Sequence, residues 1–359
     1  MAELQVGLGE RSYPILIQAG SLDGIGRDLA DRRVAKRYGV ISDDRVAALY
    51  GQRLLAALQG NGIAADLLVF PHGEASKTLA TVGDLASRLA RAGFDRKDGL
   101  IALGGGVTGD ITGFLAASYM RGIPFVQVPT SLLAQVDSSV GGKTGVDIPE
   151  GKNLVGAFYQ PKAVYIDPEV LSTLDSREFL SGLAEVIKYG IIRDSSFFHF
   201  LEENRERIIA LEPSCLEQMI STCCRIKADV VEQDEREGGL RRILNYGHTI
   251  GHAVEAASAF SINHGLAVAI GMVAAAGLAV LKGVLTAEDG RRISSLIAQY
   301  GLPVAVPSDL DRDTIKTYLN TDKKVVAGKV FYILPTAIGE TVITDDISSA
   351  ELDEVLLPR

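Results

Sequence analysis

Short apolar runs alternate with longer stretches of helical spacing through the first half of the chain, and this alternation constrains the fold more than any other feature. The run "YGVISDD" is followed by the helix-like "RVAALYGQRLLAALQG", and "DLLVF" then resumes the strand pattern. The order recurs with a helix at 79–92, the strand "LIAL", a helix from about Asp110 and the strand "IPFVQVP". Such a succession predicts a mostly parallel sheet with helices on its faces. The opening "LQVGLGERSYPILIQAG" predicts a hairpin that leads into this sheet.

The pattern changes near Leu171, where long helical periods begin and strand signals become scarce until "KVFYILP". A chain of 359 residues exceeds what one hydrophobic core usually supports, which favours two domains. We therefore predict an α/β N-terminal domain with a mostly parallel sheet at residues 1–170 and a mainly α-helical C-terminal domain at residues 171–359. Because ligand sites favour domain interfaces, we expect the active site in the cleft between them.

The formal net charge of -9 argues against general nucleic-acid binding, although a small anionic molecule fits if cations are gathered locally. Cys215, Cys223 and Cys224 form no CxxC pair, so we expect no disulfide framework, which suits a reducing cytoplasm. The opening "MAELQVGLGE" lacks the pattern of a signal peptide. The segment "GLAVAIGMVAAAGLAVL" is at the lower length limit for a membrane span, but its Ala and Gly content favours a helix buried among other helices.

The stretch "LIALGGGVTGD" places three glycines between an apolar strand and a helix, where backbone N–H groups can approach a phosphate. Gly104, Gly106 and Gly109 satisfy GxGxxG, but the motif lies about a hundred residues into the chain and residues 111–135 contain no acid to bind a ribose. Asp43, at the end of an earlier strand, is the candidate for that contact. A glycine turn required only for close packing is the alternative.

Two Glu–Lys pairs have three-residue spacing. Glu74 and Lys77 lie in "GEASK", a pattern more typical of a solvated helix pair than of a binding site. Glu185 and Lys188 lie in "GLAEVIKYG", where the flanking residues are almost all apolar. Charges in such surroundings point into an enclosed place, and a buried charge needs a partner or a metal. A surface ion pair is the alternative interpretation.

The stretch from Pro129 to Pro161 is long and rich in Gly, Ser and Thr, and a loop of this length in a compact domain is commonly functional. Lysines beside glycines can bind phosphate or polarise hydroxyl groups. An irregular surface segment with solvated lysines is the alternative. The charged and amide residues of this stretch are Asp137, Lys143, Asp147, Lys152 and Asn153.

Three of the five histidines, His248, His252 and His264, fall within a short segment. The spacing of His248 and His252 places both imidazoles on one helical face. A zinc protease would have a glutamate directly after the first histidine, whereas Thr249 stands there. A carboxylate with two imidazoles suits zinc or a similar divalent ion, so the cluster favours a metal site over structural histidines.

Together, "ALGGGVTGDITGF", "ASYMRGIPFVQVPTSLLAQVDSSVGGKTGVD", "GKNLVGAFYQP", "AEVIKYG", "DEREGGLRRILNYGHTIGHAVE" and "NHGLAVAIGM" resemble the 3-dehydroquinate synthase family of sugar-phosphate cyclases. The resemblance runs from about Ser42 to Val330. It implies a catalytic metal, zinc or cobalt, held by Glu185, His248 and His264, while His252 faces the substrate phosphate. It also implies a homodimer, because Arg121 matches an arginine that reaches the partner's active site.

The resemblance implies the remaining contacts as well. For NAD, the matching residues are Asp43, Glu74, Lys77, Gly104, Gly105, Gly106, Val107, Asp110, Thr130, Ser131, Lys143 and Lys152. For the substrate, they are Asp137, Lys143, Asn153, Lys188, Lys227, Arg241, Asn245 and His252. A further phosphate contact falls to Lys323 or Lys324. Arg45 replaces the asparagine that many relatives have next to the adenosine.

The implied reaction converts 3-deoxy-D-arabino-heptulosonate 7-phosphate to 3-dehydroquinate and phosphate in the shikimate pathway. It proceeds by transient NAD-dependent oxidation, phosphate elimination, re-reduction, ring opening and intramolecular aldol closure, without net redox change. The alternatives are another sugar-phosphate cyclase, which would act on a ketose without the carboxylate, and a metal-dependent polyol dehydrogenase, which would release NADH. The presence of both Lys227 and Arg241 favours the acid substrate.

Overall fold

The computed structural model describes residues 2–321, 325–326 and 329–356, and these residues form two compact units. The first unit comprises Met1–Leu174 together with Leu211–Glu232, and the second comprises Asp175–Ala210 together with Gln233–Arg359. The segment Leu211–Glu232 thus belongs to the first unit, whereas the domain boundary predicted from sequence, at residue 170, assigns it to the second domain. The chain therefore leaves the first unit, returns to it for one helix and leaves it again.

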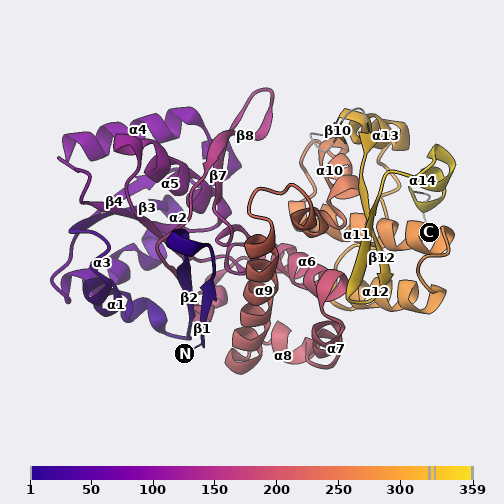
Figure 1. The fold of residues 1–359 in the computed structure, drawn as a ribbon, viewed down its shortest axis with the longest axis horizontal. Helices are drawn as coiled ribbons and strands as arrows, with labels where there is room; N and C mark the ends of the chain where they lie inside the picture. The colour runs from indigo at the N-terminus through magenta and orange to yellow at the C-terminus, as the bar shows by residue number, and fades with distance from the viewer. Residues whose placement is uncertain (1, 322–324, 327–328, 357–359) are drawn as a thin grey trace. The chain divides into compact units, whose positions relative to one another are not determined.

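A seven-stranded sheet forms the centre of the first unit, with strand order β1-β2-β9-β6-β5-β3-β4 (Figure 1). Only β1 and β2 pair antiparallel, and every other neighbouring pair is parallel. Both the mostly parallel sheet and the opening hairpin are therefore confirmed. The strands are β1 (Ala2–Val6), β2 (Tyr13–Ile17), β3 (Arg37–Asp43), β4 (Ala64–Phe70), β5 (Gly99–Gly104), β6 (Phe125–Pro129) and β9 (Val164–Ile166).

Helices cover both faces of this sheet. Side chains on both faces are therefore buried, which explains why the central strands are continuously apolar and do not alternate between apolar and polar residues. Along β5, Leu100 packs into one core cluster with residues of α4 and α5, while Ile101 packs into the other with residues of α1 and α3. The helix predicted at 79–92 is α4, so that prediction is confirmed. The helices of this unit are α1 (Ile25–Arg32), α2 (Asp44–Val46), α3 (Gln52–Gln59), α4 (Leu79–Arg91), α5 (Gly106–Ser118) and α9 (Pro213–Gln233).

The Gly-rich stretch from Pro129 to Pro161 is more regular than a long loop. It contains a short π-helix, Ala134–Ser138, followed by the antiparallel hairpin of β7 (Lys143–Ile148) and β8 (Gly151–Phe158). Thr144 and Val146 of β7 are buried, which gives this hairpin a packed side. The lysines at 143 and 152 therefore lie on strands rather than on irregular backbone.

The second unit is mainly helical, as predicted. At its centre is α11, whose hydrophobic residues surround the helix, the pattern of an element buried on all sides. This helix is long and apolar enough to cross a membrane, with mean hydropathy 2.0, but 72% of it is buried inside the protein. The elements are α6 (Ser176–Arg193), α7 (Ser195–Glu203), α8 (Arg205–Ile209), α10 (His248–Ala257), α11 (His264–Leu281), α12 (Ala287–Gln299), α13 (Arg312–Thr321), α14 (Ser349–Leu356), β10 (Val325–Val326), β11 (Lys329–Val330), β12 (Tyr332–Ala337) and β13 (Glu340–Thr344).

Candidate active site

Two glycines bring three helices of the second unit into backbone contact. A Cβ on Gly265, at the start of α11, would lie 2.1 Å from the Ser181 carbonyl oxygen of α6. A Cβ on Gly271 would lie 1.9 Å from the carbonyl oxygen of Gly247, which precedes α10. No side chain fits at either contact, so both α6 and α10 lie directly against α11. Residues near these crossing points consequently come close together.

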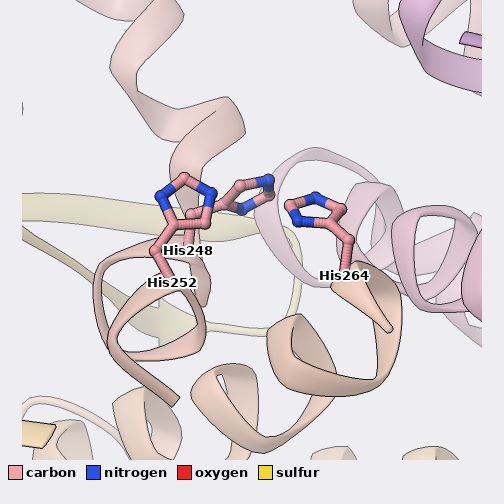
Figure 2. Close-up of side chains that lie close together, drawn as sticks. All are labelled: His248, His252 and His264. Atoms are coloured by element: carbon pink, nitrogen blue, oxygen red, sulfur yellow. The ribbon is translucent and has the colours of Figure 1, made fainter. Parts of the chain in front are cut away.

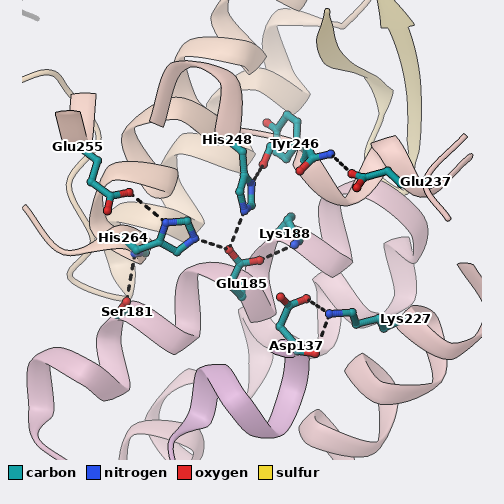
Figure 3. A network of polar contacts seen from close by, with 12 residues as sticks. Asp137, Ser181, Glu185, Lys188, Lys227, Glu237, Tyr246, His248, Glu255 and His264 are labelled. Carbon is teal, nitrogen blue, oxygen red and sulfur yellow. Dashed lines mark hydrogen bonds and ion pairs between the residues drawn. The ribbon is translucent and has the colours of Figure 1, made fainter. Parts of the chain in front are cut away.

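Glu185 on α6 faces His248 on α10 and His264 on α11 (Figure 3). Its Oε1 lies 3.3 Å from His248 Nε2 and 3.7 Å from His264 Nε2. The carboxylate is 1% exposed, and its Oε2 is in contact with the ammonium group of Lys188, one helical turn along α6. The predicted metal ligands Glu185, His248 and His264 are therefore brought together by the fold.

The second nitrogen of each imidazole has its own partner. His248 Nδ1 lies 3.1 Å from the carbonyl oxygen of Tyr246, and His264 Nδ1 lies 3.2 Å from Glu255 Oε2. Since a carbonyl only accepts a hydrogen bond, His248 Nδ1 carries a proton and Nε2 is left to bind a cation. Histidines that bind metals are typically held in this way.

Electrostatics in this cluster favour a bound cation. Burial alone would raise the pKa of Glu185, but Lys188 and His248 hold it well below its usual range. Burial would lower the pKa of His264, but hydrogen bonds with Glu185 and Glu255 raise it to about 9. In the metal-free site, Lys188 and protonated His264 thus balance the charge of Glu185, and a bound divalent cation would replace the proton of His264. A carboxylate oxygen and two imidazole nitrogens are a donor set for zinc, so these residues fit such an ion.

His252 joins the same cluster one turn further along α10. One ring nitrogen from each of His248, His252 and His264 could bind a metal, and these three nitrogens all lie within 4.8 Å of one another (Figure 2). Geometry alone therefore offers two sets of three ligands, in which Glu185 or His252 completes the pair of His248 and His264. Both sets are compatible with the sequence-based expectation that His248 and His264 bind the metal.

A tight turn after α9 presents two predicted substrate residues of the second unit. Asp234 accepts hydrogen bonds from the backbone N–H groups of Gly238, Gly239 and Arg241, which lower its pKa against the effect of burial. The Arg241 side chain is 2% exposed, and its guanidinium donates to the carbonyl oxygen of Glu235. Asn245 is the last residue of a 3-10 helix, Leu240–Asn245, and its Nδ2 donates to Glu237 Oε1 at 2.6 Å.

The glycine turn of the first unit lies between β5 and α5. Thr130, the residue after β6, donates its N–H to the carbonyl oxygen of Gly104 at 3.0 Å. A Cβ on Gly104 would lie 2.3 Å from Thr108 Oγ1, so close packing requires this glycine whether or not a phosphate binds. The N-terminus of α5, from Gly106, also presents N–H groups suited to an anion. The two interpretations of the motif are therefore compatible.

Charged residues predicted to contact NAD cluster at the start of α4 and α5. Lys77 Nζ and Asp110 Oδ2 form an ion pair at 2.6 Å, and the lysine side chain is 6% exposed. Burial lowers the pKa of Lys77, but Asp110 and Glu74 raise it above its usual value.

Asp43 accepts hydrogen bonds from the N–H groups of Arg45 and Val46 and so caps α2. This carboxylate therefore has a structural role at the end of β3.

Further predicted residues of the first unit take separate positions. Lys227 of α9 places its Nζ 2.7 Å from Asp137 Oδ1, which joins these two predicted substrate residues.

Asn153 on β8 adopts a φ of 55° and donates its N–H to Asp147 Oδ1. Arg121 is exposed, with a φ of 67°. Val107 and Ser131 are half-buried, as is Lys152, whereas Lys143 is exposed. Lys323 and Lys324 lie outside the described residues.

Comparison with known proteins identifies the family. The models of the N-terminal and C-terminal parts of 3-dehydroquinate synthase match residues 67–181 and 182–325. The chain is 49% identical over 357 residues to the 3-dehydroquinate synthase of Desulforamulus reducens, covering 99% of each chain. It is 50% identical over 358 residues to that of Colwellia psychrerythraea, covering 99% of this chain and all of the relative. The chain belongs to the 3-dehydroquinate synthase family.

Solved structures place this member of the 3-dehydroquinate synthase family among related cyclases. A 2-epi-5-epi-valiolone synthase from Streptomyces hygroscopicus, with NAD+ and Zn2+ bound, is 31% identical with a TM-score of 0.89, covering 98% of this chain and 97% of that one. A 2-deoxy-scyllo-inosose synthase, complexed with carbaglucose-6-phosphate, NAD+ and Co2+, is 28% identical with a TM-score of 0.87, covering 99% of each. A glycerol dehydrogenase from Schizosaccharomyces pombe is 17% identical with a TM-score of 0.67, covering 95% of this chain and 88% of that one, and shares the fold alone.

Sequence reasoning missed two carboxylates of this site, Glu237 and Glu255. Glu237 lies in "EREGG" and looks like one charge among several on a solvated turn. Glu255 is seven residues after His248 on α10, and the i, i+7 spacing on one helical face is the signal that could have found it. Neither contact follows from the family motifs alone, because each depends on how the chain folds back on itself.

Proposed function

We propose that the chain is a 3-dehydroquinate synthase, a phosphorus–oxygen lyase of the shikimate pathway that depends on NAD and a divalent metal. It would convert 3-deoxy-D-arabino-heptulosonate 7-phosphate to 3-dehydroquinate and phosphate, a step toward chorismate and the aromatic amino acids. The observation that carries the proposal is the convergence of Glu185, His248 and His264 in a chain 49% identical to such enzymes over its full length.

The metal ligands in this proposal are Glu185, His248 and His264, with His252 turned to the substrate phosphate. Bound zinc or cobalt would supply Lewis acidity to substrate hydroxyl groups, and bound NAD+ would accept and return a hydride. The protein's own task is to fix both imidazoles by their Nδ1 atoms and to keep Glu185 ionised beside Lys188. The resulting site is ordered before the substrate arrives, which lowers the cost of reorganisation.

NAD would bind in the first unit, where backbone N–H groups at the start of α5 can face its phosphates. Lys77 and Asp110 form a buried ion pair beside the glycine turn and would fix the cofactor's position. The proposed cofactor residues are Asp43, Glu74, Lys77, Gly104, Gly105, Gly106, Val107, Asp110, Thr130, Ser131, Lys143 and Lys152.

Buried cations account for recognition of a doubly anionic substrate by a chain of net charge -9. Lys188, Lys227 and Arg241 are 1%, 6% and 2% exposed. A buried ammonium or guanidinium interacts strongly with an anion because little water screens it. We assign these residues to the carboxylate and hydroxyl groups of the substrate, with Asp137, Lys143, Asn153 and Asn245 completing the contacts.

The proposal includes a cytoplasmic homodimer in which Arg121 contributes to the partner's active site. Arg121 is exposed and adopts a left-handed backbone conformation next to Met120, which is also exposed. Sedimentation should give the mass of a dimer. Mixing Arg121→Ala protein with a variant inactivated at His264 should restore activity only if the arginine acts across the interface.

The activity is tested by phosphate release from 3-deoxy-D-arabino-heptulosonate 7-phosphate with catalytic NAD+ and zinc, while absorbance reports NADH. We expect about one phosphate per carbocycle, no accumulation of NADH, and loss of release after chelation or in His264→Ala. Turnover of sedoheptulose 7-phosphate instead would indicate another cyclase. Net production of NADH would indicate a polyol dehydrogenase, and either result would refute the proposed function.

A further inference from the structure

Glu255 is the carboxylate of the histidine cluster to which the proposed function gives no role. On α10 it follows His248 by seven residues and His252 by three, so all three share one helical face. Its Oε2 lies 3.2 Å from His264 Nδ1, on the side of the imidazole ring opposite the nitrogen that faces Glu185 (Figure 3). The Glu255 side chain is only 9% exposed, so water screens this contact weakly.

The backbone of the α10–α11 connection holds Glu255 in place. Its carbonyl oxygen accepts hydrogen bonds from the Phe260 N–H at 3.0 Å and from Ser258 Oγ at 2.8 Å. Ser258 Oγ in turn accepts from the N–H of Ile262 at 3.2 Å. The connection therefore folds back onto Glu255 before α11 begins at His264. The position of this carboxylate relative to His264 is thus built into the fold.

The charge balance of the site indicates that Glu255 supplies negative charge to it. Glu185 is in contact with Lys188, so this pair alone offers a divalent cation little net negative charge. His248 is oriented by a neutral carbonyl group, whereas His264 is oriented by a carboxylate. A carboxylate behind an imidazole fixes the tautomer and strengthens the opposite nitrogen as a donor.

We propose that Glu255 is a positioning residue that holds His264 with its Nε2 toward the metal and raises the affinity of the site for a divalent cation. The proposal rests on the metal site of the proposed function. It holds with either set of three ligands, because His264 belongs to both.

The test is a titration of metal-free protein with Zn2+ in competition with a chromophoric chelator. We expect Glu255→Gln, which keeps the shape and loses the charge, to weaken zinc binding about 10–100-fold. Glu178→Gln is the matched control, because Glu178 accepts a hydrogen bond from Asn263, the residue before His264, at 3.1 Å. That variant should bind zinc with wild-type affinity.

A second readout separates positioning from a general structural role. In metal-free protein, at a pH above the raised pKa of His264 where its imidazole is neutral, the nitrogen resonances should report a proton on Nδ1 in the wild type and a mixture of tautomers in Glu255→Gln. Circular dichroism of the same samples should be unchanged. A weaker affinity accompanied by loss of helical signal would overturn the proposal, because the defect would then lie in folding.

The outcomes also distinguish this inference from the proposed function. Equal zinc affinities in the wild type and Glu255→Gln would refute the role of Glu255 and leave the metal site intact. Absence of zinc binding in the wild type would refute the metal-dependent function itself.

Discussion

The ion pair between Glu185 and Lys188 permits a quantitative prediction, because both side chains are 1% exposed. Removal of one partner from a buried pair leaves an uncompensated charge and costs about 3–5 kcal/mol. His264, with its raised pKa, remains beside Glu185, so we expect a loss near the lower end, about 3 kcal/mol, for Lys188→Met in metal-free protein. In a unit of this size that loss corresponds to a fall in melting temperature of roughly 6–12 °C.

The assay is thermal and urea denaturation of metal-free protein followed by circular dichroism. Zinc should restore much of the lost stability, since a cation bound at Glu185 replaces the missing ammonium. Lys316→Met is the matched control, because Lys316 pairs with Asp353 at 2.7 Å on the exposed surface of the same unit. That pair should contribute less than about 1 kcal/mol.

A double variant tests whether the lost stability comes from the uncompensated charge of Glu185. Glu185→Gln with Lys188→Met removes both charges, so it should be more stable than Lys188→Met alone. If Lys188→Met costs no stability, or if the double variant is no more stable than the single one, then Glu185 does not carry a buried charge that depends on Lys188.

Three further predictions concern the fold and the substrate. Burial raises the pKa of the Tyr38 phenol to about 12 from 10.0, so the free energy of unfolding should fall as pH rises from 10 to 12. In urea titrations at pH 12, Tyr38→Phe should remove about 2 kcal/mol of that fall. Gly271→Ala should lower the free energy of unfolding by about 1–3 kcal/mol or more, whereas Gly83→Ala should be neutral or stabilising because the space around Gly83 is open. Equal melting temperatures for the two variants would refute the close contact between α10 and α11. Arg241→Lys should raise KM about 10–100-fold at unchanged zinc affinity, whereas Arg242→Lys should leave KM unchanged. A larger rise in KM for Arg242→Lys than for Arg241→Lys would contradict the assignment of Arg241 to the substrate.

Much of the fold follows from sequence because its signals are local. The period of apolar residues predicted the parallel sheet and placed α4 within one residue of its end. The β7–β8 hairpin was not predicted, because Gly, Ser and Lys within "GGKTGVDIPEGKN" weaken the strand pattern. Nor does periodicity indicate that α9 belongs to the first unit. That depends on contacts between distant residues, such as the 2.9 Å hydrogen bond from the Ala19 N–H to Glu217 Oε1.

The site shows the same division between local and distant information. The spacing of His248 and His252 predicted that both would share a face, and the structure places them together with His264. Spacing could not choose between Glu185 and His252 as the third ligand, because both lie beside the other two histidines. Resemblance to the family made that choice. Glu255 remained hidden because its contact with His264 depends on a turn at 258–263.

We propose that Glu185, His248 and His264 together hold the metal. The most direct measurement is an anomalous difference map, collected at the zinc absorption edge, from crystals grown with zinc. We expect a single strong peak within coordination distance of one Glu185 carboxylate oxygen and of Nε2 of both histidines. A peak bound by His248, His252 and His264, with Glu185 directed to Lys188 alone, would contradict it.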